Sequence, residues 1–389
     1  MSKPRLNQSK NIVISTQCFP PVIGGMENLI KGLADSLYKN NFKVFIFADS
    51  KKYLNEENYD KKLPYEIVRY KGLKIIRKRK KSLDIKKFIN YKKKINSIFC
   101  DSWKSAENLI KLKLIDHTNI FCLAHGNDVL VSKNILKRRR IKKIMNKVDC
   151  VIANSFFTRE KIIKLGINKR KIKVIYPGLN LQSVKLKNNK SFNKYKNFYP
   201  IFLTVARLEK RKNHKNIIYA IRELVKKYKN LIYFIAGDGP EKKKLLKLIS
   251  KLKLKKNIKL LGNLNEIDKA FLLKISNLHL MPTIEDKKKT SIEGFGISYV
   301  EAAFYGTPSI SSGLGGTKES VINGKTGVIC NPNDVKSIKE SIIKILSNNK
   351  KYKLISKNSN IFSKKFLWNN VIKSYLSLIS KKKFIKNDL

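Results

Sequence analysis

The sequence has few cysteines, and they form no pattern that predicts a disulfide framework or a zinc site. The five cysteines are odd in number, scattered along the chain and never paired as C-x-x-C, which favours a reducing compartment. Long apolar runs are absent too: NLIYFIAG is typical of the longest, far short of the roughly 20 residues of a membrane-spanning helix. The polar residues before the first strand-like run do not read as a signal peptide. We therefore expect a cytoplasmic protein.

Acidic residues are scarce, with 28 Asp and Glu against 85 Lys and Arg and a formal net charge of +57. Only 12 of the basic residues are Arg, and the Lys are spread along the whole chain together with Ile and Asn. Proteins that read nucleic acid gather their charge into a patch and rely on the planar Arg side chain. We therefore expect no nucleic-acid partner. A chain with many Lys residues is still suited to bind the anionic inner face of a membrane.

The first half of the chain repeats a strand–helix pattern. A buried run at 11–16, a glycine turn, a helical period from Met26 to Leu37 and a second buried run at 42–48 form a βαβ unit. This unit predicts a parallel sheet covered on both faces. The pattern continues with strands at 119–123, 149–153 and 172–175 and helices near 134–147 and 156–165. Between 51 and 118 we expect strands near 66–70 and 74–77 and two helices.

The second half repeats the pattern after a polar stretch. At 389 residues the chain suits two domains of about 170–200 residues each. The Asn- and Lys-rich residues 179–199 read as a linker between domains 1–178 and 200–365. The expected strands are 201–206, 231–236, 258–261, 278–281, 308–311 and 328–330, and the expected helices lie near 214–228, 240–253, 266–276, 297–305, 317–322 and 334–347. An amphipathic helix within 366–389 is expected to pack back on the first domain.

Two carboxylates with seven residues between them are the strongest chemical signal. Gly294 and Gly296 predict a loop that carries Glu293, and Gly306 predicts the end of the helix that follows. Glu301 then lies in the second turn of that helix. Free N–H groups behind a glycine loop suit a diphosphate, and the carboxylates suit hydroxyl groups. A lone pair at this spacing is more often a helix cap and an exposed helix residue, so other residues must support it.

Further polar residues follow other expected strands. Arg207 and Lys212 come after the strand at 201–206, where the carboxyl edge of a parallel sheet binds ligands. An Arg grips a diphosphate bidentately and a Lys adds a compact charge. His125 follows the strand at 119–123. Glycines at strand ends let a backbone approach a ligand closely; they are Gly24, Gly25, Gly237 and Gly239.

These residues lie in segments that resemble retaining glycosyltransferase family 4, whose GT-B fold places two Rossmann-like α/β domains face to face across a cleft. The matching segments run from about residue 12 to 370, and 290–330 is the most specific. In order they are FPPVIGG, AHGND, ANSFFTRE, VIYPGLN, VARLEKRKNH, IAGDGPE, MPTIEDKKKTSIEGFGISYVEAAFYGTPSISS, GGTKESVINGKTGVI and FLW. Ala206 and Asn213 stand where glycine is common in the family, and Gly313 stands where an acidic residue is common.

The resemblance implies a role for each candidate residue. Arg207 and Lys212 would hold the donor diphosphate, and Glu301 the nucleotide ribose. Glu293 would contact hydroxyls of the transferred sugar, and His125 would lie beside its anomeric centre. Glycines and neighbouring loop residues would line the donor, with Gly25 also near the acceptor; they are Gly24, Gly25, Gly237, Gly239, Gly294, Phe295 and Gly296.

The expected reaction is sugar transfer from a nucleotide diphosphate sugar to the hydroxyl of a glycan or lipid-linked acceptor in cell-surface polysaccharide, lipopolysaccharide or glycolipid synthesis. No Asp-x-Asp motif is present, so we expect no metal and no cofactor. Two alternatives remain open. One is a sugar-nucleotide epimerase or a phosphorylase on the same plan, the latter needing a lysine for pyridoxal phosphate. The other is a basic nucleic-acid-binding protein, which leaves the loop residues unexplained.

Overall fold

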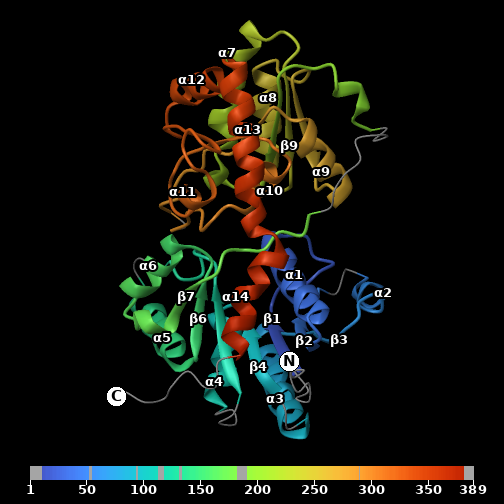
Figure 1. The fold of residues 1–389 in the computed structure, drawn as a ribbon, viewed down its shortest axis with the longest axis vertical. Coiled ribbons are helices and arrows are strands. Elements are labelled where there is room, and N and C mark those ends of the chain that lie inside the picture. The colour runs from blue at the N-terminus through green and yellow to red at the C-terminus, as the bar shows by residue number, and fades with distance from the viewer. Residues whose placement is uncertain are drawn as a thin grey trace, which may run out of the picture. The chain divides into compact units, whose positions relative to one another are not determined.

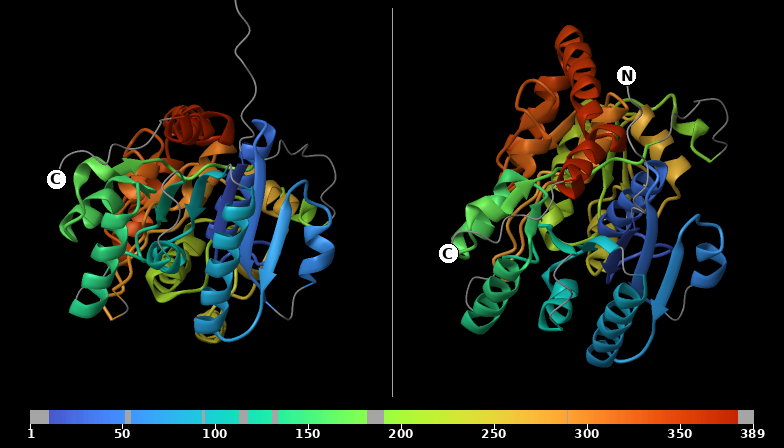
Figure 2. Two further views of the ribbon diagram at one scale, coloured as in Figure 1. Left: turned by 90° about the horizontal axis from the view of Figure 1, so that it is seen from below. Right: turned by 60° about the horizontal axis from the view of Figure 1, so that its bottom comes forward.

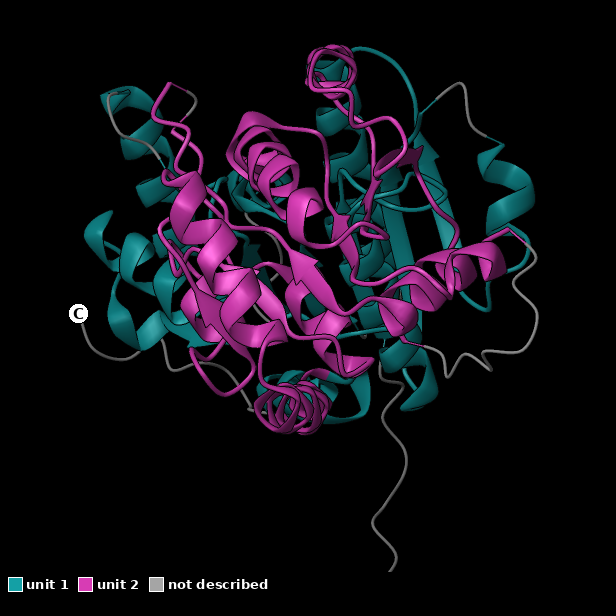
Figure 3. Cartoon of the chain, turned by 90° about the horizontal axis from the view of Figure 1, so that it is seen from above, with its two compact units in different colours: residues 1–180, 367–389 teal, residues 181–366 magenta. Residues whose placement is uncertain are grey.

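The computed structural model describes residues 11–51, 55–92, 95–112, 118–130, 134–181, 191–288 and 290–380. The chain divides into two compact units (Figure 3). Unit 1 comprises Met1–Asn180 and Leu367–Leu389, and unit 2 comprises Leu181–Phe366. Each unit is built on one parallel sheet (Figure 1).

The sheet of unit 1 has seven strands in the order β3-β2-β1-β4-β5-β6-β7. Side chains alternate across it: Ile12 and Ile14 of β1 face one layer of helices and Val13 faces the other. A sheet buried on both faces needs such continuous apolar runs. The strands are β1 (Asn11–Thr16), β2 (Lys43–Asp49), β3 (Glu66–Tyr70), β4 (Ile95–Cys100), β5 (Asn119–Ala124), β6 (Cys150–Ala153) and β7 (Ile172–Val174).

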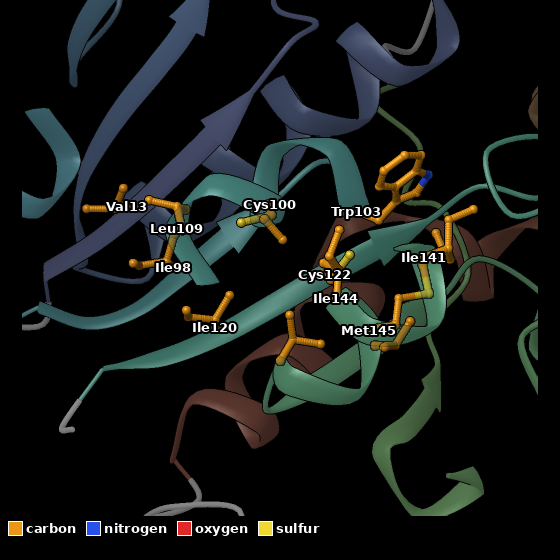
Figure 4. Packing of buried hydrophobic residues seen from close by; sticks show 14 of the residues in the cluster. Val13, Ile98, Cys100, Trp103, Leu109, Ile120, Cys122, Ile141, Ile144 and Met145 are labelled. Carbon is orange, nitrogen blue, oxygen red and sulfur yellow. The ribbon is translucent and has the colours of Figure 1, made fainter. Parts of the chain in front are cut away.

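Two layers of helices cover this sheet (Figure 2). One layer holds α1 (Gly25–Lys39) and α14 (Trp368–Ser380). The opposite layer holds α3 (Lys74–Lys92), α4 (Trp103–Lys111), α5 (Ile135–Lys147) and α6 (Phe156–Lys164). Its packing against β1, β4 and β5 appears in Figure 4. The short α2 (Glu56–Asp60) and the 3-10 turn η1 (Lys169–Lys171) complete the unit.

The C-terminal helix α14 belongs to unit 1. This agrees with the expectation that an amphipathic helix near the C-terminus packs on the first domain. Trp368 begins the helix and fills space that two glycines leave. A Cβ atom on Gly32 of α1 would lie 2.0 Å from the indole Nε1, and one on Gly178 would lie 2.4 Å from the indole ring. Residues 381–389 of the expected segment lie outside the described residues.

The region 51–118 contains both a correct and a wrong expectation. The strand at 66–70 is confirmed as β3. The strand expected near 74–77 is wrong, because α3 begins at Lys74. Its inward side chains recur with helical spacing at Ile85 and Ile89, whereas Ile75 and Ile76 are exposed. The central strand β4 was not anticipated, because the polar Asn96 and Ser97 interrupt its apolar run.

The sheet of unit 2 has six strands in the order β10-β9-β8-β11-β12-β13. They are β8 (Ile201–Val205), β9 (Ile232–Ala236), β10 (Ile258–Gly262), β11 (Leu278–Leu280), β12 (Ser309–Ser311) and β13 (Gly327–Ile329). The helices are α7 (His214–Lys227), α8 (Lys242–Lys251), α9 (Glu266–Ile275), α10 (Ile297–Phe304), α11 (Thr317–Ser320), α12 (Val335–Leu346) and α13 (Asn349–Ser363), with 3-10 turns η2 (Asn193–Tyr195), η3 (Lys210–Lys212) and η4 (Lys364–Phe366).

Part of the expected linker belongs to this core. Residues 182–190 lie outside the described residues, but the rings of Phe192 and Tyr195 pack on Phe234 of β9, with centroids 6.1 and 5.0 Å away. The helix α13 had no counterpart among the expected elements. Among the helices described in either unit, none has the length and apolar character needed to cross a membrane.

Candidate functional site

The loop that leaves β8 forms one wall of the candidate site in unit 2. It continues as η3 and reaches Asn213, whose φ of 61° lies in the left-handed region that Asn tolerates better than most residues. The Asn213 side chain donates hydrogen bonds to the carbonyls of Pro282 (2.9 Å) and Pro332 (2.7 Å). This residue therefore ties the loop after β8 to the segments that follow β11 and β13.

Glu293 lies at the centre of the site and binds two cations through one oxygen. Its Oε2 accepts hydrogen bonds from Lys212 Nζ and from Arg211 Nη1, each at 2.5 Å. Among the residues that the structure describes, none donates a hydrogen bond to the other oxygen, Oε1. The Lys212 ammonium also contacts Met281 Sδ at 3.5 Å. The expected neighbours Lys212 and Glu293 are therefore brought together, 81 residues apart in the sequence.

The protonation of this cluster follows from burial and charge. Burial alone would raise the pKa of Glu293, but the charges of Lys212 and Arg211 outweigh it and hold the pKa at about 2. Burial lowers the pKa of Lys212, and Glu293 opposes that shift. For Arg211, burial lowers the pKa, but the charges of Glu293 and Glu209 raise it by more, so that the pKa lies above its ordinary value. The site thus holds a carboxylate between two charged donors.

Arg207 lies apart from this buried cluster. Its side chain is 73% exposed and pairs with Glu209, with Nη1 3.1 Å from Oε1. Glu209 also contacts Arg211, whose Nε lies 3.1 Å from Oε2. Arg207, Glu209, Arg211, Glu293 and Lys212 thus form a row of alternating charges, which we call the charge chain. Arg211 was missed in the sequence because it stands within the basic run KRK; its place after a strand was the available signal.

The glycine loop at 294–296 is held from behind by a second glycine loop. A Cβ atom on Gly316 would lie 1.9 Å from the carbonyl oxygen of Gly294. Gly296 precedes α10 with φ 88°, and no side chain caps the first turn of this helix. The N-terminal end of α10 is therefore free of a competing side chain, as an anion site requires.

Phe295, expected to bind the donor, has its side chain in the core. It is buried against Phe366, with ring centroids 5.4 Å apart, and Ser320 Oγ donates a hydrogen bond to its carbonyl at 2.8 Å. The side chain therefore anchors the loop from inside, so that a ligand would meet only the backbone here.

Glu301 lies in the second turn of α10, as expected, but it is paired. Lys269 of α9 donates a hydrogen bond to Glu301 Oε1 at 2.9 Å and also lies 2.8 Å from Glu266. Burial would lower the pKa of Lys269, but the two carboxylates raise it above its ordinary value. Glu301 is thus fixed by one cation that it shares with a neighbour.

Gly237 and Gly239 bring the loop after β9 against the loop after β8. A Cβ atom at Gly237 would lie 2.0 Å from the carbonyl oxygen of Ala206, and one at Gly239 would lie 2.7 Å from that of Leu208. The φ of Gly237, 135°, is also one that other residues rarely adopt. These glycines hold the strand-end loop that carries Arg207.

In unit 1, His125 and the first glycine loop lie at the carboxyl ends of their strands. Gly24 precedes α1, which begins at Gly25. His125 follows β5, and its ring Nε2 lies 2.8 Å from the carbonyl oxygen of Asp101, so that Nε2 carries the proton. The backbone N–H of His125 donates to Asp128 Oδ1 at 2.9 Å. Burial raises the pKa of Asp128, and His125 opposes the shift.

Asp101 is a buried residue that the sequence did not indicate, because β4 before it was not anticipated. Its carboxylate accepts hydrogen bonds from Thr16 Oγ1 (2.9 Å), the Gln17 N–H (2.6 Å) and Ser105 Oγ (2.6 Å). One residue therefore holds the start of the loop between β1 and α1 through its side chain, and His125 through its carbonyl. Within the described ranges of both units, no group of three or more His, Cys, Asp or Glu could hold a metal ion.

Two family models match the chain, one in each half. "Glycosyltransferase Family 4" matches residues 23–183, and "Glycosyl transferases group 1" matches residues 186–361. The chain is a family 4 glycosyltransferase. This assignment favours the transferase over the epimerase, phosphorylase and nucleic-acid alternatives.

Curated relatives agree over most of the length of this glycosyltransferase. It is 23% identical over 347 residues to a GDP-mannose-dependent monoacylated alpha-(1-6)-phosphatidylinositol monomannoside mannosyltransferase of Corynebacterium glutamicum, with 88% of this chain and 90% of the relative covered. It is 22% identical over 344 residues to a GDP-mannose-dependent alpha-(1-6)-phosphatidylinositol monomannoside mannosyltransferase of Mycolicibacterium smegmatis, with 86% and 89% covered.

Solved structures show the same fold. The glycosyltransferase matches HepE of Anabaena in complex with UDP at a TM-score of 0.77 and 19% identity, with 95% of this chain and 99% of that chain covered. It matches a glycosyltransferase of Rickettsia africae at a TM-score of 0.77 and 19% identity, with 98% and 100% covered. The two Rossmann-like parallel sheets are thus those of the GT-B fold.

Proposed function

We propose that this glycosyltransferase moves a sugar from a nucleotide diphosphate sugar to an acceptor hydroxyl with retention at the anomeric carbon. The observation that carries the proposal is the Glu293 cluster, in which one carboxylate oxygen binds Lys212 and Arg211 while the other accepts no hydrogen bond from a described residue. Such a carboxylate is oriented before a sugar hydroxyl arrives. HepE, whose structure has the same fold, has been crystallised in complex with UDP-glucose.

The leaving diphosphate needs its developing charge neutralised. Lys212 and the exposed Arg207 supply cations, and the uncapped N-terminus of α10 adds N–H groups. We assign these groups to the donor phosphates in place of a metal, because the chain has no Asp-x-Asp motif. Transfer that persists in excess chelator supports this assignment; transfer that stops and returns on adding Mg²⁺ or Mn²⁺ contradicts it.

Other residues take roles that follow from their placement and from the family. We assign to Glu301 the ribose hydroxyls of the donor. His125 of unit 1 is proposed to orient the transferred sugar or the incoming hydroxyl. Its Nε2 proton is used by the Asp101 carbonyl, so only Nδ1 is available to accept a hydrogen bond from a substrate hydroxyl.

The donor roles are tested by replacing Lys212 and Glu293 separately with Ala. Screening UDP-, GDP- and ADP-sugars by thermal shift and hydrolysis first identifies the donor. Each substitution is then expected to lower kcat by about 10²–10³, the cost of losing one preorganised electrostatic contact. Lys210→Ala, at an exposed neighbouring position, is the matched control. Near-normal transfer by both variants would falsify the assignment.

We further propose that the acceptor is lipid-linked and that unit 1 rests on an anionic membrane surface. Exposed apolar side chains mark the first turns of α3 and α5, with Ile75 84% and Leu136 77% exposed. Exposed basic residues flank them, among them Lys74, Arg79 and Arg139. Apolar side chains that insert and cations that meet anionic headgroups together favour such binding. Two relatives are named for phosphatidylinositol monomannoside substrates.

Co-sedimentation with liposomes of anionic and of zwitterionic lipid tests the membrane proposal. Wild-type protein is expected to bind the anionic vesicles at low salt and to be released as salt rises. The double variant I75E/I76E is expected to bind at least roughly tenfold more weakly. The control L354E/I361E changes two similarly exposed apolar residues of α13. Equal binding by both double variants, or no binding by wild type, contradicts the proposal.

A further inference from the structure

Arg211 contacts two carboxylates at once and is largely enclosed. Its side chain is 14% exposed, against 73% for Arg207 in the same loop. Its Nε donates to Glu209 Oε2 at 3.1 Å and its Nη1 to Glu293 Oε2 at 2.5 Å. The fork of this guanidinium is therefore engaged within the protein.

We propose that Arg211 is a positioning residue for the donor sugar. It holds the Glu293 carboxylate through Oε2, so that Oε1 stays directed to a sugar hydroxyl, and it does not itself touch the donor. The proposal rests on the donor-binding role of Glu293 proposed above.

The geometry assigns the orientation of the Glu293 carboxylate to Arg211 more than to Lys212. A Lys side chain is a point charge on a flexible stem, whereas a planar guanidinium transmits orientation from one partner to the other. Arg211 is fixed at both ends: Glu209 holds its Nε, and its own carbonyl accepts a hydrogen bond from the Ile284 N–H at 2.9 Å. Precise placement of a binding group needs such a supporting contact.

The charge chain as a whole suits an anionic ligand. Its three cations and two carboxylates leave one cation in excess. Lys212 and the exposed Arg207 are the cations assigned to the donor phosphates, because Arg211 is engaged by Glu209 and Glu293.

Binding measurements separate positioning from direct contact. Titration calorimetry with UDP and UDP-glucose, or GDP and GDP-mannose if that pair binds, compares four variants. Arg211→Ala is expected to weaken nucleotide-sugar binding roughly tenfold while leaving nucleoside diphosphate binding within about twofold of wild type. Glu293→Gln should show the same pattern. Lys212→Ala should weaken both ligands, and the control Lys210→Ala neither.

Two further measurements distinguish positioning from a general structural role. The double variant R211A/E293Q should bind the nucleotide sugar no worse than E293Q alone, because Arg211 acts through Glu293. In R211A the pKa of Glu293 rises from about 2, because one of its two cations is lost, so on acidification nucleotide-sugar affinity should fall at a higher pH than in wild type, and E293Q should not show this dependence. Among the described residues, the other titratable groups beside Glu293 or its two cations include Glu209, the buried Tyr299 and the buried His279, and burial lowers the pKa of His279 to about 3.

The outcomes that overturn the proposal differ from those that overturn the proposed function. If R211A weakens UDP or GDP as strongly as K212A does, Arg211 is a phosphate ligand. If R211A binds both ligands like wild type, or if the double variant is additively worse than E293Q, Arg211 does not act through Glu293. If instead K212A and E293Q bind the nucleotide sugar normally, the donor site itself is misassigned. An unchanged unfolding temperature shows that R211A is folded.

Discussion

Each unit places a carboxylate with little solvent exposure at the carboxyl edge of its sheet, but the two carboxylates are held differently. In unit 2, Glu293 binds two cations, Lys212 and Arg211, at one oxygen. In unit 1, Asp101 accepts hydrogen bonds from neutral donors, which include the Thr16 hydroxyl and the Gln17 N–H. Cations can be shared with an anionic ligand, whereas neutral donors only hold the protein to itself. The arrangement around Glu293 therefore suits ligand binding, and the arrangement around Asp101 suits stabilising the fold of unit 1.

The largest expected effect that sharpens this contrast is on activity. Glu293→Gln removes the charge between two cations but keeps the shape, and we expect kcat to fall by about 10²–10³ with little change in fold. Steady-state transfer assays with the donor that the screen identifies measure it, with Lys210→Gln as control. A variant that keeps more than half of the wild-type rate would remove the distinction between the two carboxylates.

The corresponding change in unit 1 should act on stability. Asp101→Ala leaves the Gln17 N–H and the Ser105 hydroxyl without their carboxylate acceptor, which we expect to lower the free energy of unfolding by about 3 kcal/mol. Both tryptophans, Trp103 and Trp368, belong to unit 1, so tryptophan fluorescence during urea unfolding reports on this unit. An unfolding midpoint equal to that of wild type would show that Asp101 does not stabilise unit 1.

Acid should destabilise unit 2 through a buried histidine beside the charge chain. Burial lowers the pKa of His214 to about 4, so between about 4 and its ordinary value of about 6.5 the unfolded chain binds the proton more readily. Stability contributed by the neutral ring is therefore present above about pH 6.5 and is lost as pH falls. Replacing His214 with Gln should remove about 2 kcal/mol of the loss between pH 7 and pH 5.

Calorimetry of both proteins at the two pH values measures this difference for His214. His279 also contributes to the acid loss, because burial lowers its pKa to about 3, so H214Q should flatten the pH dependence without abolishing it. Parallel curves for wild type and H214Q would contradict the assignment.

The smallest expected effect concerns the Thr16 hydroxyl, one of the groups that contact Asp101. Thr16→Val keeps the shape of the side chain but removes a hydroxyl that lies 2.9 Å from Asp101 Oδ2 and that also accepts a hydrogen bond from the Cys18 N–H at 2.9 Å, and we expect a loss of about 1 kcal/mol in the stability of unit 1. The same fluorescence-detected unfolding measures it. A loss as large as that of Asp101→Ala would mean that the other donors contribute little.

Much of the fold and part of the site could be predicted from periodicity and strand ends. The βαβ pattern and the glycine loop before α10 were found because their signals are local. The helix start at Lys74 was mistaken for a strand, since Leu73, Ile75 and Ile76 are apolar although exposed. Because β4 was not predicted, Asp101 was not recognised as a candidate residue. Its position directly after a strand is the local signal that could have indicated it.

The sequence by itself determined most of the strands other than β4, the points where those strands end, and that Glu293 lies on a loop before a helix. Only the tertiary structure decided which cations meet it. Arg211 and Glu293 are 82 residues apart, and in the run KRK nothing local distinguishes the enclosed Arg211 from the exposed Lys210. The difference arises because the loop, turned at Asn213 and anchored to Pro282 and Pro332, directs one side chain inward and the other to solvent.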